Sequence, residues 1–451
     1  MKGISRVLIC NRGEIAVRII RACRDMGIES VVTVSEADKE SLPAQIADRT
    51  VCIGPSRSTE SYLKVGTIIS AALGTGADAI HPGYGFLAEQ PELPEACKRN
   101  GITFIGPTAE NIRTMGDKIL ARKIAREIGI PLIPGSERVH DTESAMKKAE
   151  EVGYPVLLKA AAGGGGKGMK IVERPKDMKA IFDEASGEAQ AAFGDNRIYV
   201  EHFIPNVRHI EVQILGDKLG NIVHLFERDC SLQRRHQKMV EEAPSPAISA
   251  ELREEICRSA LTISRHIQYE NAGTVEFILD QNNQRFYFLE MNTRIQVEHP
   301  VTEMITGIDL VKEQIRAASG LPISFSQEDI RLDGHAIECR INAESARDGF
   351  RPCPGRIEQW LGPQGNDIRL DTHCYPGYVI PHFYDSLLAK LITRGESRNH
   401  AIEKMTSALS NFTVTGIDTI IPFHQAILQH PDYLEGKVNT RWVEEILLRS
   451  S

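Results

Sequence analysis

A predicted β-hairpin near the middle of the chain constrains the fold more than any other feature of the sequence. Residues 273–280 and 285–289 carry the apolar alternation that is typical of strands, and four polar, turn-like residues join them. If the hairpin is centred on Asn283, Glu276 and Glu290 stand directly opposite each other. Like charges so placed are destabilising, so the pattern favours a cation between the two carboxylates.

Polar side chains continue at every second position beyond this hairpin. If the chain stays extended, they share one face: Glu290, Asn292, Arg294, Gln296 and Glu298. Mg²⁺ binds carboxylate oxygens and fills its remaining sites with water and phosphate. We therefore predict a phosphate-handling metal site formed by Glu276, Glu290 and Asn292. A solvated sheet face is the alternative, and the opposed Glu276 argues against it.

The composition is that of a globular chain. Its 451 residues are 41% hydrophobic and 25% charged, enough for two or three domains. The net charge of −8 and the pI near 6.0 argue against general nucleic-acid binding. Nine scattered cysteines with no CxxC pair indicate small core residues in a reducing compartment. We find no signal peptide and no bilayer-spanning run, so we expect a cytoplasmic protein without a membrane partner.

The N-terminal region predicts a parallel sheet. Residues 6–10 and 30–34 have strand patterns and enclose a helical pattern at 13–26, which is a βαβ unit. The first turn has one glycine and lacks the GxGxxG set, so a scaffold is favoured over a dinucleotide site. The Gly-Pro-aromatic loop at 81–87 follows a strand and fits a ligand-site wall or a structural turn about equally.

A glycine-rich loop lies between two predicted strands, residues 155–159 and 169–172. It is not a P-loop, because glycine follows Lys167 where Ser or Thr is required and a strand follows where a helix is required. The backbone N–H groups of four successive glycines can still approach a triphosphate, with Lys159 and Lys167 as point charges. A hairpin without a ligand is disfavoured, because nothing would offset the ordering cost of the glycines.

Two later segments carry further charges. For the basic cluster at residues 228–238 we favour a phosphate-facing role over a solvated surface, because the whole chain is acidic. Residues 334–342 alternate as a strand, with Glu338 and Arg340 on one face and apolar residues on the other. An arginine beside a glutamate in such a strand is most often part of a cross-strand ion pair.

Six segments, in one order, resemble the biotin carboxylase family of the ATP-grasp superfamily over residues 2 to about 445. They are residues 81–87, 115–118, 159–169, 228–244, 290–304 and 338–344. The resemblance implies an α/β and α+β fold in three parts. These are a Rossmann-like parallel sheet (1–115), an ATP-grasp core (116–330) with a mobile glycine-loop lid at about 134–205, and a C-terminal mixed domain (331–451).

The resemblance also implies an activity. ATP and bicarbonate would form carboxyphosphate, and the carboxyl group would pass to N1′ of biotin on a carrier protein. By match of motif, ATP would be held by Lys118, Lys159, Gly165, Gly166, Glu201, His202, Phe203, Ile204, His209, Gln233 and His236. Glu276, Glu290 and Asn292 would hold two Mg²⁺ or Mn²⁺ ions, in agreement with the hairpin argument.

The same match assigns the carboxylation residues. Bicarbonate or carboxyphosphate would be held by Lys238, Arg294, Gln296 and Val297. Glu298 would deprotonate bicarbonate, and Arg340 would stabilise the enolate-like biotin. Tyr84 and Asp385 resemble residues that line the biotin pocket. Two positions depart from the family pattern: Ala162 stands where glycine is frequent and His202 where lysine is common, which bears on lid flexibility and on contacts near adenine.

Partners and alternatives complete the expectation. Nothing resembles a biotinyl-lysine segment or a carboxyltransferase, so we expect a homodimeric subunit that meets a biotin carboxyl carrier protein and a carboxyltransferase made as other chains. The final acceptor stays open between acetyl-CoA, as in fatty acid biosynthesis, another acyl-CoA and a 2-oxo acid. The alternatives are an ATP-grasp ligase with another acceptor and a nucleotide-binding regulatory subunit. Neither needs Arg294, Gln296, Glu298 and Arg340 together.

Overall fold

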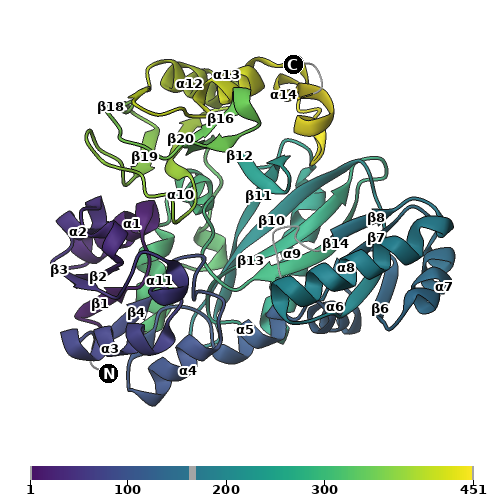
Figure 1. Cartoon of the computed structure of the whole chain (residues 1–451), viewed down its shortest axis with the longest axis horizontal. Helices are drawn as coiled ribbons and strands as arrows, with labels where there is room; N and C mark the ends of the chain where they lie inside the picture. The colour runs from purple at the N-terminus through teal and green to yellow at the C-terminus, as the bar shows by residue number, and fades with distance from the viewer. Residues whose placement is uncertain (1–2, 162–168, 449–451) are drawn as a thin grey trace.

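The N-terminal part is a parallel sheet with strand order β3-β2-β1-β4-β5, as predicted. The computed structural model describes residues 3–161 and 169–448 (Figure 1). The strands are Arg6–Ile9 (β1), Glu29–Val34 (β2), Arg49–Cys52 (β3), Ala79–His81 (β4) and Thr103–Phe104 (β5). The helices are Gly13–Asp25 (α1), Leu42–Ile46 (α2), Val65–Thr75 (α3), Glu92–Arg99 (α4) and Ala109–Gly116 (α5).

Apolar residues on both faces of β1 explain its central position. Val7 and Ile9 pack into one hydrophobic cluster with Ile15 and Ile19 of α1, whereas Leu8 packs into a second cluster on the other face. A strand buried on both faces is typical of parallel sheets, because crossover helices cover them.

A four-stranded antiparallel sheet of order β6-β9-β7-β8 forms a separate lobe at one end of the long axis (Figure 1). Its strands are Gly135–Val139 (β6), Val156–Ala160 (β7), Met169–Val172 (β8) and Ile198–His202 (β9). Helices α7 (Thr142–Val152) and α8 (Met178–Phe193) share a small apolar core with it. Gly165, Gly166 and Ala162 of the predicted lid loop lie outside the described residues.

A larger, eight-stranded antiparallel sheet has the order β14-β13-β10-β11-β12-β15-β20-β19. Its strands are Val207–Gly216 (β10), Ile222–Arg234 (β11), Gln237–Ala243 (β12), Asn271–Asp280 (β13), Arg285–Asn292 (β14), His335–Asn342 (β15), Ile368–Thr372 (β19) and Leu387–Gly395 (β20). The sheet joins residues on both sides of position 330, where we predict a domain boundary. The domain limits stay a prediction.

The hairpin of β13 and β14 places Glu276 opposite Glu290, as predicted. The predicted turn centre is off by half a residue, because Asp280 pairs with Arg285. The register then shifts by one between Phe288 and Glu290, and Leu289 is the extra residue of a β-bulge. The bulge shifts the register by one residue and so compensates for the different position of the turn. The predicted pairing of the two carboxylates is therefore confirmed, although the sequence pattern did not indicate the bulge.

The extended segment that we predicted beyond this hairpin is not a strand. β14 ends at Asn292, and α10 (His299–Thr306) follows after an irregular stretch at residues 293–298. Pro300 lies in the first turn of α10, where the missing N–H costs nothing. The five alternating polar residues therefore do not share one strand face, and tertiary contacts set their directions.

The C-terminal part packs on the far half of the large sheet. Ile337, Cys339 and Ile341 of β15 face its apolar core, and Glu338 and Arg340 face the other way, as predicted. Remaining helices include Ala250–His266 (α9), Leu310–Ala318 (α11), Arg398–Ser410 (α12), Ile421–Gln429 (α13) and Pro431–Leu434 (α14), and short strands include Gln359–Leu361 (β18) and Thr413–Thr415 (β21).

The nine cysteines are free, and seven are buried. Within the described ranges no helix has the length and apolarity to span a bilayer.

Candidate active site

A cavity of about 1000 Å³ lies among the N-terminal sheet, the four-stranded lobe and the eight-stranded sheet. It gathers the predicted site residues that fall in the described part of the chain. These are Tyr84, Lys118, Lys159, Glu201, His202, Phe203, Ile204, His209, Gln233, His236, Lys238, Glu276, Glu290, Asn292, Arg294, Gln296, Val297, Glu298, Arg340 and Asp385. Residues more than 300 positions apart in sequence therefore line one space.

Glu276 on β13 is held on both sides of its carboxylate. It accepts hydrogen bonds from Asn292 Nδ2 and Gln296 Nε2, both at 2.8 Å, and lies 3.0 Å from His209 Nε2. Burial raises the pKa of this carboxyl, but the charges of Lys238 and His209 outweigh burial and hold the pKa well below its usual value. These contacts therefore fix the orientation of the Glu276 carboxylate in the free protein.

Glu290 faces the same cavity from β14. Its nearest cation is Lys118, the first residue of α6 (Lys118–Glu127), whose Nζ lies 2.6 Å from the carboxylate. Together with Glu276 and the amide oxygen of Asn292, Glu290 offers oxygen ligands of the kind that Mg²⁺ and Mn²⁺ take. The donor set thus fits the predicted metal ions.

Lys238 on β12 joins three carboxylates. Its Nζ lies 2.5 Å from both Glu211 and Glu298, and 3.3 Å from Glu276. Burial lowers the pKa of this lysine, but the three carboxylates outweigh burial and raise it well above its usual value. Glu211, Glu276 and His209 offer ligand atoms within 4.8 Å of one another. Lys238 contacts both Glu211 and Glu276 of this group, so its ammonium supplies the positive charge that a metal ion would otherwise bring.

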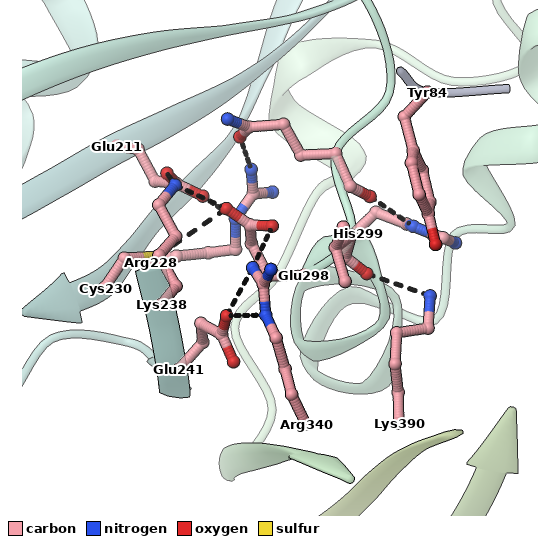
Figure 2. Close-up of polar contacts among 12 residues, drawn as sticks. Tyr84, Glu211, Arg228, Cys230, Lys238, Glu241, Glu298, His299, Arg340 and Lys390 are labelled. Carbon is pink, nitrogen blue, oxygen red and sulfur yellow. Dashed lines mark hydrogen bonds and ion pairs between the residues drawn. The ribbon is translucent and has the colours of Figure 1, made fainter. Parts of the chain in front are cut away.

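Glu298 is held between two cations. Lys238 contacts one carboxylate oxygen at 2.5 Å, and Arg340 Nη2 donates to the other at 3.0 Å (Figure 2). Burial raises the pKa of Glu298, but Lys238, Arg340 and Arg228 outweigh burial and hold it well below its usual value. Arg340 also donates through Nε to Glu241 of the neighbouring strand at 2.6 Å. The cross-strand ion pair that is the ordinary alternative to a role toward biotin is therefore present in the free protein.

The lobe closes the opposite end of the cavity. Lys159 on β7 donates to Glu201 on β9 at 2.9 Å, and Arg122 pairs with the other carboxylate oxygen. Burial raises the pKa of Glu201, but these two cations outweigh burial and keep the pKa below its usual value. The two cations thus share one carboxylate, so this group of three keeps one net positive charge, and Lys159 lines the cavity.

The edge that we predict to border adenine is partly occupied by the protein itself. The amide N–H groups of His202 and Phe203 donate to backbone carbonyls at 2.8 and 3.0 Å. His202 Nδ1 also lies 3.0 Å from the carbonyl oxygen of Gly153. Among the described atoms of residues 202–204, the amide of Ile204 is the donor that has no hydrogen bond.

Three family models match the chain in sequence order. "Biotin carboxylase, N-terminal domain" matches residues 3–112, "Carbamoyl-phosphate synthase L chain, ATP binding domain" matches 117–325, and "Biotin carboxylase C-terminal domain" matches 338–445. Biotin carboxylase 1 of Bacillus subtilis is 52% identical over 442 residues, which is 98% of either chain. The chain belongs to the biotin carboxylase family.

Two solved structures of biotin carboxylases resemble this chain over nearly its whole length. A Campylobacter jejuni biotin carboxylase, described as a β,γ-ATP complex, matches with a TM-score of 0.96 at 46% identity over 98% of both chains. The biotin carboxylase domain dimer of Hydrogenobacter thermophilus 2-oxoglutarate carboxylase, with MgADP, ADP and bicarbonate, matches with a TM-score of 0.95 at 46% identity over 99% of this chain and 98% of that one. The predicted fold class is thereby confirmed.

Arg294 lines the cavity and contacts one of the polar residues that alternate with it on the predicted face. Its Nε donates to Glu89 at 3.0 Å, and its Nη2 donates to Asn292 Oδ1 at 3.2 Å. Although β14 ends before Arg294, this side chain and Glu290 line the same cavity. Glu89 escaped prediction, since it follows the 81–87 loop in a stretch without a motif.

The 81–87 loop is both a turn and a wall. Gly83 and Gly85 have φ of +61° and +68°, and Asn11 Nδ2 donates to the carbonyl oxygen of Tyr84 at 2.7 Å. The Tyr84 hydroxyl donates to Glu14 of α1, while the residue also lines the cavity. Asp385 lines the cavity from the C-terminal part.

The phosphate-facing role predicted for the whole basic cluster is wrong for its first residue. Arg228 is fully buried, and it donates to Glu211 at 2.6 Å and to Gln296 Oε1 at 2.9 Å. It supports the cavity wall from behind and does not line it. Residues 235–238 and Gln233 do reach the cavity.

Sequence reasoning missed several charged residues around the site: Glu14, Glu211, Glu241 and Lys390. For Glu211 a signal existed, because it lies two residues after His209 and therefore on the same strand face. For Lys390 the signal was a single lysine inside the otherwise apolar run at 387–392. A charge in such a run is rarely buried unless it is paired.

Proposed function

We propose that this chain is a biotin carboxylase, which carboxylates biotin on a biotin carboxyl carrier protein with ATP and bicarbonate and releases ADP and phosphate. The observation that carries the proposal is the carboxylate of Glu298, held between Lys238 and Arg340. It lies in the cavity that also holds the opposed Glu276 and Glu290. Membership of the family, and a family structure with MgADP and bicarbonate, support it.

In this proposal ATP lies between the lobe and the large sheet. Its phosphates are bound by Lys118, Lys159 and the glycine loop, and its base lies along residues 201–204. Further contacts come from His209, Gln233 and His236. Glu276, Glu290 and Asn292 hold two Mg²⁺ or Mn²⁺ ions, and such ions neutralise charge during phosphoryl transfer.

Glu298 acts as the base in the first step. A bicarbonate hydroxyl gives its proton to Glu298, the resulting oxygen attacks the γ-phosphorus, and ADP leaves, so that carboxyphosphate forms. Bicarbonate would bind at Lys238, Arg294, Gln296 and Val297. It would then compete with Glu298 for Lys238, which pairs with Glu298 in the free protein. Any weakening of that ion pair raises the pKa of Glu298 and makes it a better base.

Arg340 serves the second step. Carboxyphosphate breaks its C–O bond to give CO₂ and phosphate, and the phosphate takes the N1′ proton of biotin. The N1′ electron pair then attacks CO₂, while Arg340 stabilises the negative charge on the ureido oxygen. Tyr84 and Asp385 border the biotin ring. Exclusion of water matters here, because carboxyphosphate hydrolyses readily.

The assembly context follows from the same family. We propose a homodimer in the cytoplasm that receives the biotinylated carrier protein and passes it to a carboxyltransferase on another chain. The three predicted domains, 1–115, 116–330 and 331–451, belong to this proposal. The matched family segments at 3–112, 117–325 and 338–445 support it.

An ADP-release assay tests the function. With Mg²⁺, ATP, bicarbonate and free biotin, we expect ADP release that requires bicarbonate and rises with biotin. Arg340→Met should lose the response to biotin and keep the slow bicarbonate-dependent release. Lys404→Met is the control, because Lys404 is also paired with an acid, Asp367 at 2.8 Å, but lies on α12 away from the cavity.

Two outcomes favour the alternatives. An ATP-grasp ligase with another acceptor would release ADP without any response to bicarbonate and biotin together. A regulatory protein would bind ATP and release no ADP under any of these conditions.

A further inference from the structure

Lys390 is a buried lysine for which the reaction proposed above has no role. It lies on β20, is fully buried, and stands directly opposite Arg340 of β15. Its Nζ donates to the carbonyl oxygen of Val297 at 2.9 Å, the contact drawn from the labelled Lys390 in Figure 2. The same Nζ lies 3.2 Å from Glu14. Asp371 of β19 is 3.9 Å away. A buried ammonium needs such partners, and one of them belongs to the proposed bicarbonate loop.

Each of residues 296, 297 and 298 is held by a hydrogen bond or ion pair from a neighbouring side chain. The carbonyl oxygen of Gln296 lies 2.7 Å from His299 Nδ1 (Figure 2). A carbonyl can only accept, so the proton is on Nδ1, and burial lowers the pKa of His299 so that the ring stays neutral. The next carbonyl, of Val297, is held by Lys390, and the Glu298 side chain is held by Arg340.

These contacts fix the directions of two amide groups. In a planar trans peptide the N–H points opposite to the C=O. The N–H of Val297 therefore points away from His299, and the N–H of Glu298 points away from Lys390. In the described part of the chain neither N–H has a hydrogen-bond partner. A hydrogen bond to the carbonyl of a peptide also polarises its N–H, which makes it a better donor to an anion.

Lys390 is also connected, through Glu14, to Tyr84 in the wall of the cavity. Glu14 of α1 lies between Lys390 and the Tyr84 hydroxyl, which donates to it. Burial raises the pKa of Glu14, and Lys390 opposes this effect. The order Tyr84, Glu14, Lys390, Val297 is thus a continuous set of contacts from the proposed biotin wall to the proposed bicarbonate loop.

We infer that Lys390 is a positioning residue, which aims the Val297–Glu298 peptide at bicarbonate and ties this peptide through Glu14 to Tyr84. Lys390 itself touches no substrate. The inference rests on the proposed function, because it assigns a cause to the bicarbonate affinity of that same site.

The direct test is the KM for bicarbonate in ADP release by Lys390→Met. We expect it to rise at least tenfold, while the Kd for ADP, from calorimetry, changes less than twofold. Lys390→Arg keeps the charge and should recover part of the loss. The Lys404→Met control should leave both constants unchanged. A bicarbonate KM within twofold of wild type in folded Lys390→Met would overturn the inference.

A milder variant covers the case in which Lys390→Met does not fold. Tyr84→Phe removes one hydroxyl at the far end of the contacts, and its bicarbonate KM is measured without biotin. If Tyr84 acts only on biotin, this constant stays at the wild-type value, which also contradicts the inference. We expect a rise of about threefold. Failure of the proposed function looks different, because wild type itself would then show no bicarbonate-dependent release.

Discussion

Glu338 offers a direct test of how this fold buries charge. Its side chain is fully buried on β15, directly opposite Glu241 of β12. Within the described residues, neither of its carboxylate oxygens has a hydrogen-bond partner. Burial raises the pKa of Glu338 well above its usual value, Lys390 opposes this, and Glu241 adds to it. The folded protein therefore keeps a proton on Glu338 at a pH where the unfolded chain has lost it.

The sign of the effect on stability follows from this difference. A carboxyl whose pKa is raised by folding stabilises the fold fully at low pH, and this stability falls as pH rises from the unfolded pKa to the folded one. The loss is about 1.4 kcal/mol per pH unit for one proton. Glu338→Gln imitates the protonated form at every pH. Its free energy of unfolding, relative to wild type, should therefore grow by about 1.4 kcal/mol per unit above about pH 5.

Calorimetry makes this measurable. For 451 residues the entropy of unfolding is about 0.95 kcal/mol/K, so 1.4 kcal/mol corresponds to about 1.5 °C in Tm. For each pH unit between the unfolded and the folded pKa of Glu338, the Tm of Glu338→Gln should gain about 1.5 °C on wild type. The control is Glu254→Gln, at a site 80% exposed, where the gap should stay constant. A Glu338→Gln gap that is constant or shrinks with pH would refute the reasoning.

Three further predictions concern the site and the core. Glu298→Gln should lower bicarbonate-dependent ADP release at least 100-fold, because an amide cannot take the proton, whereas ADP binding by calorimetry should change less than threefold; an unchanged rate would exclude the base role. Chelation with EDTA should stop ADP release and added Mg²⁺ should restore it, and Glu290→Gln should need about tenfold more Mg²⁺ for half-maximal rate; turnover that survives EDTA would contradict the metal site. Phe288→Ala, at a fully buried side chain of β14, should cost about 3–5 kcal/mol and lower the Tm by about 3–5 °C in calorimetry; a drop under 1 °C would show that the core refills the space.

The sequence pattern was sufficient where a local period decides the structure. The alternation of β13 and β14 predicted the opposition of Glu276 and Glu290, which depends on strands that are neighbours in sequence. The bulge at Leu289 could not be predicted, because an extra residue leaves no mark on a short apolar alternation. The end of β14 at Asn292 was also hidden, since polar residues continue to alternate through the following loop.

Long-range partners were beyond reach for a different reason. Lys238 contacts Glu211 and Glu298, and Arg340 contacts Glu241, through the order of strands in the large sheet. One sequence fixes the faces of each strand but not which strand lies beside it. The family resemblance supplied the roles of Glu298 and Arg340, and no residue pattern alone would have placed them together.

The irregular residues 293–298 work as a strap across the large sheet. Gln296 contacts β13 and β11, and two residues later Glu298 contacts β12 and β15. One short loop therefore ties together four strands of the large sheet. Adding or removing one residue between Gln296 and Glu298 would move Glu298 away from Lys238 and Arg340, and would separate the two halves of the proposed reaction.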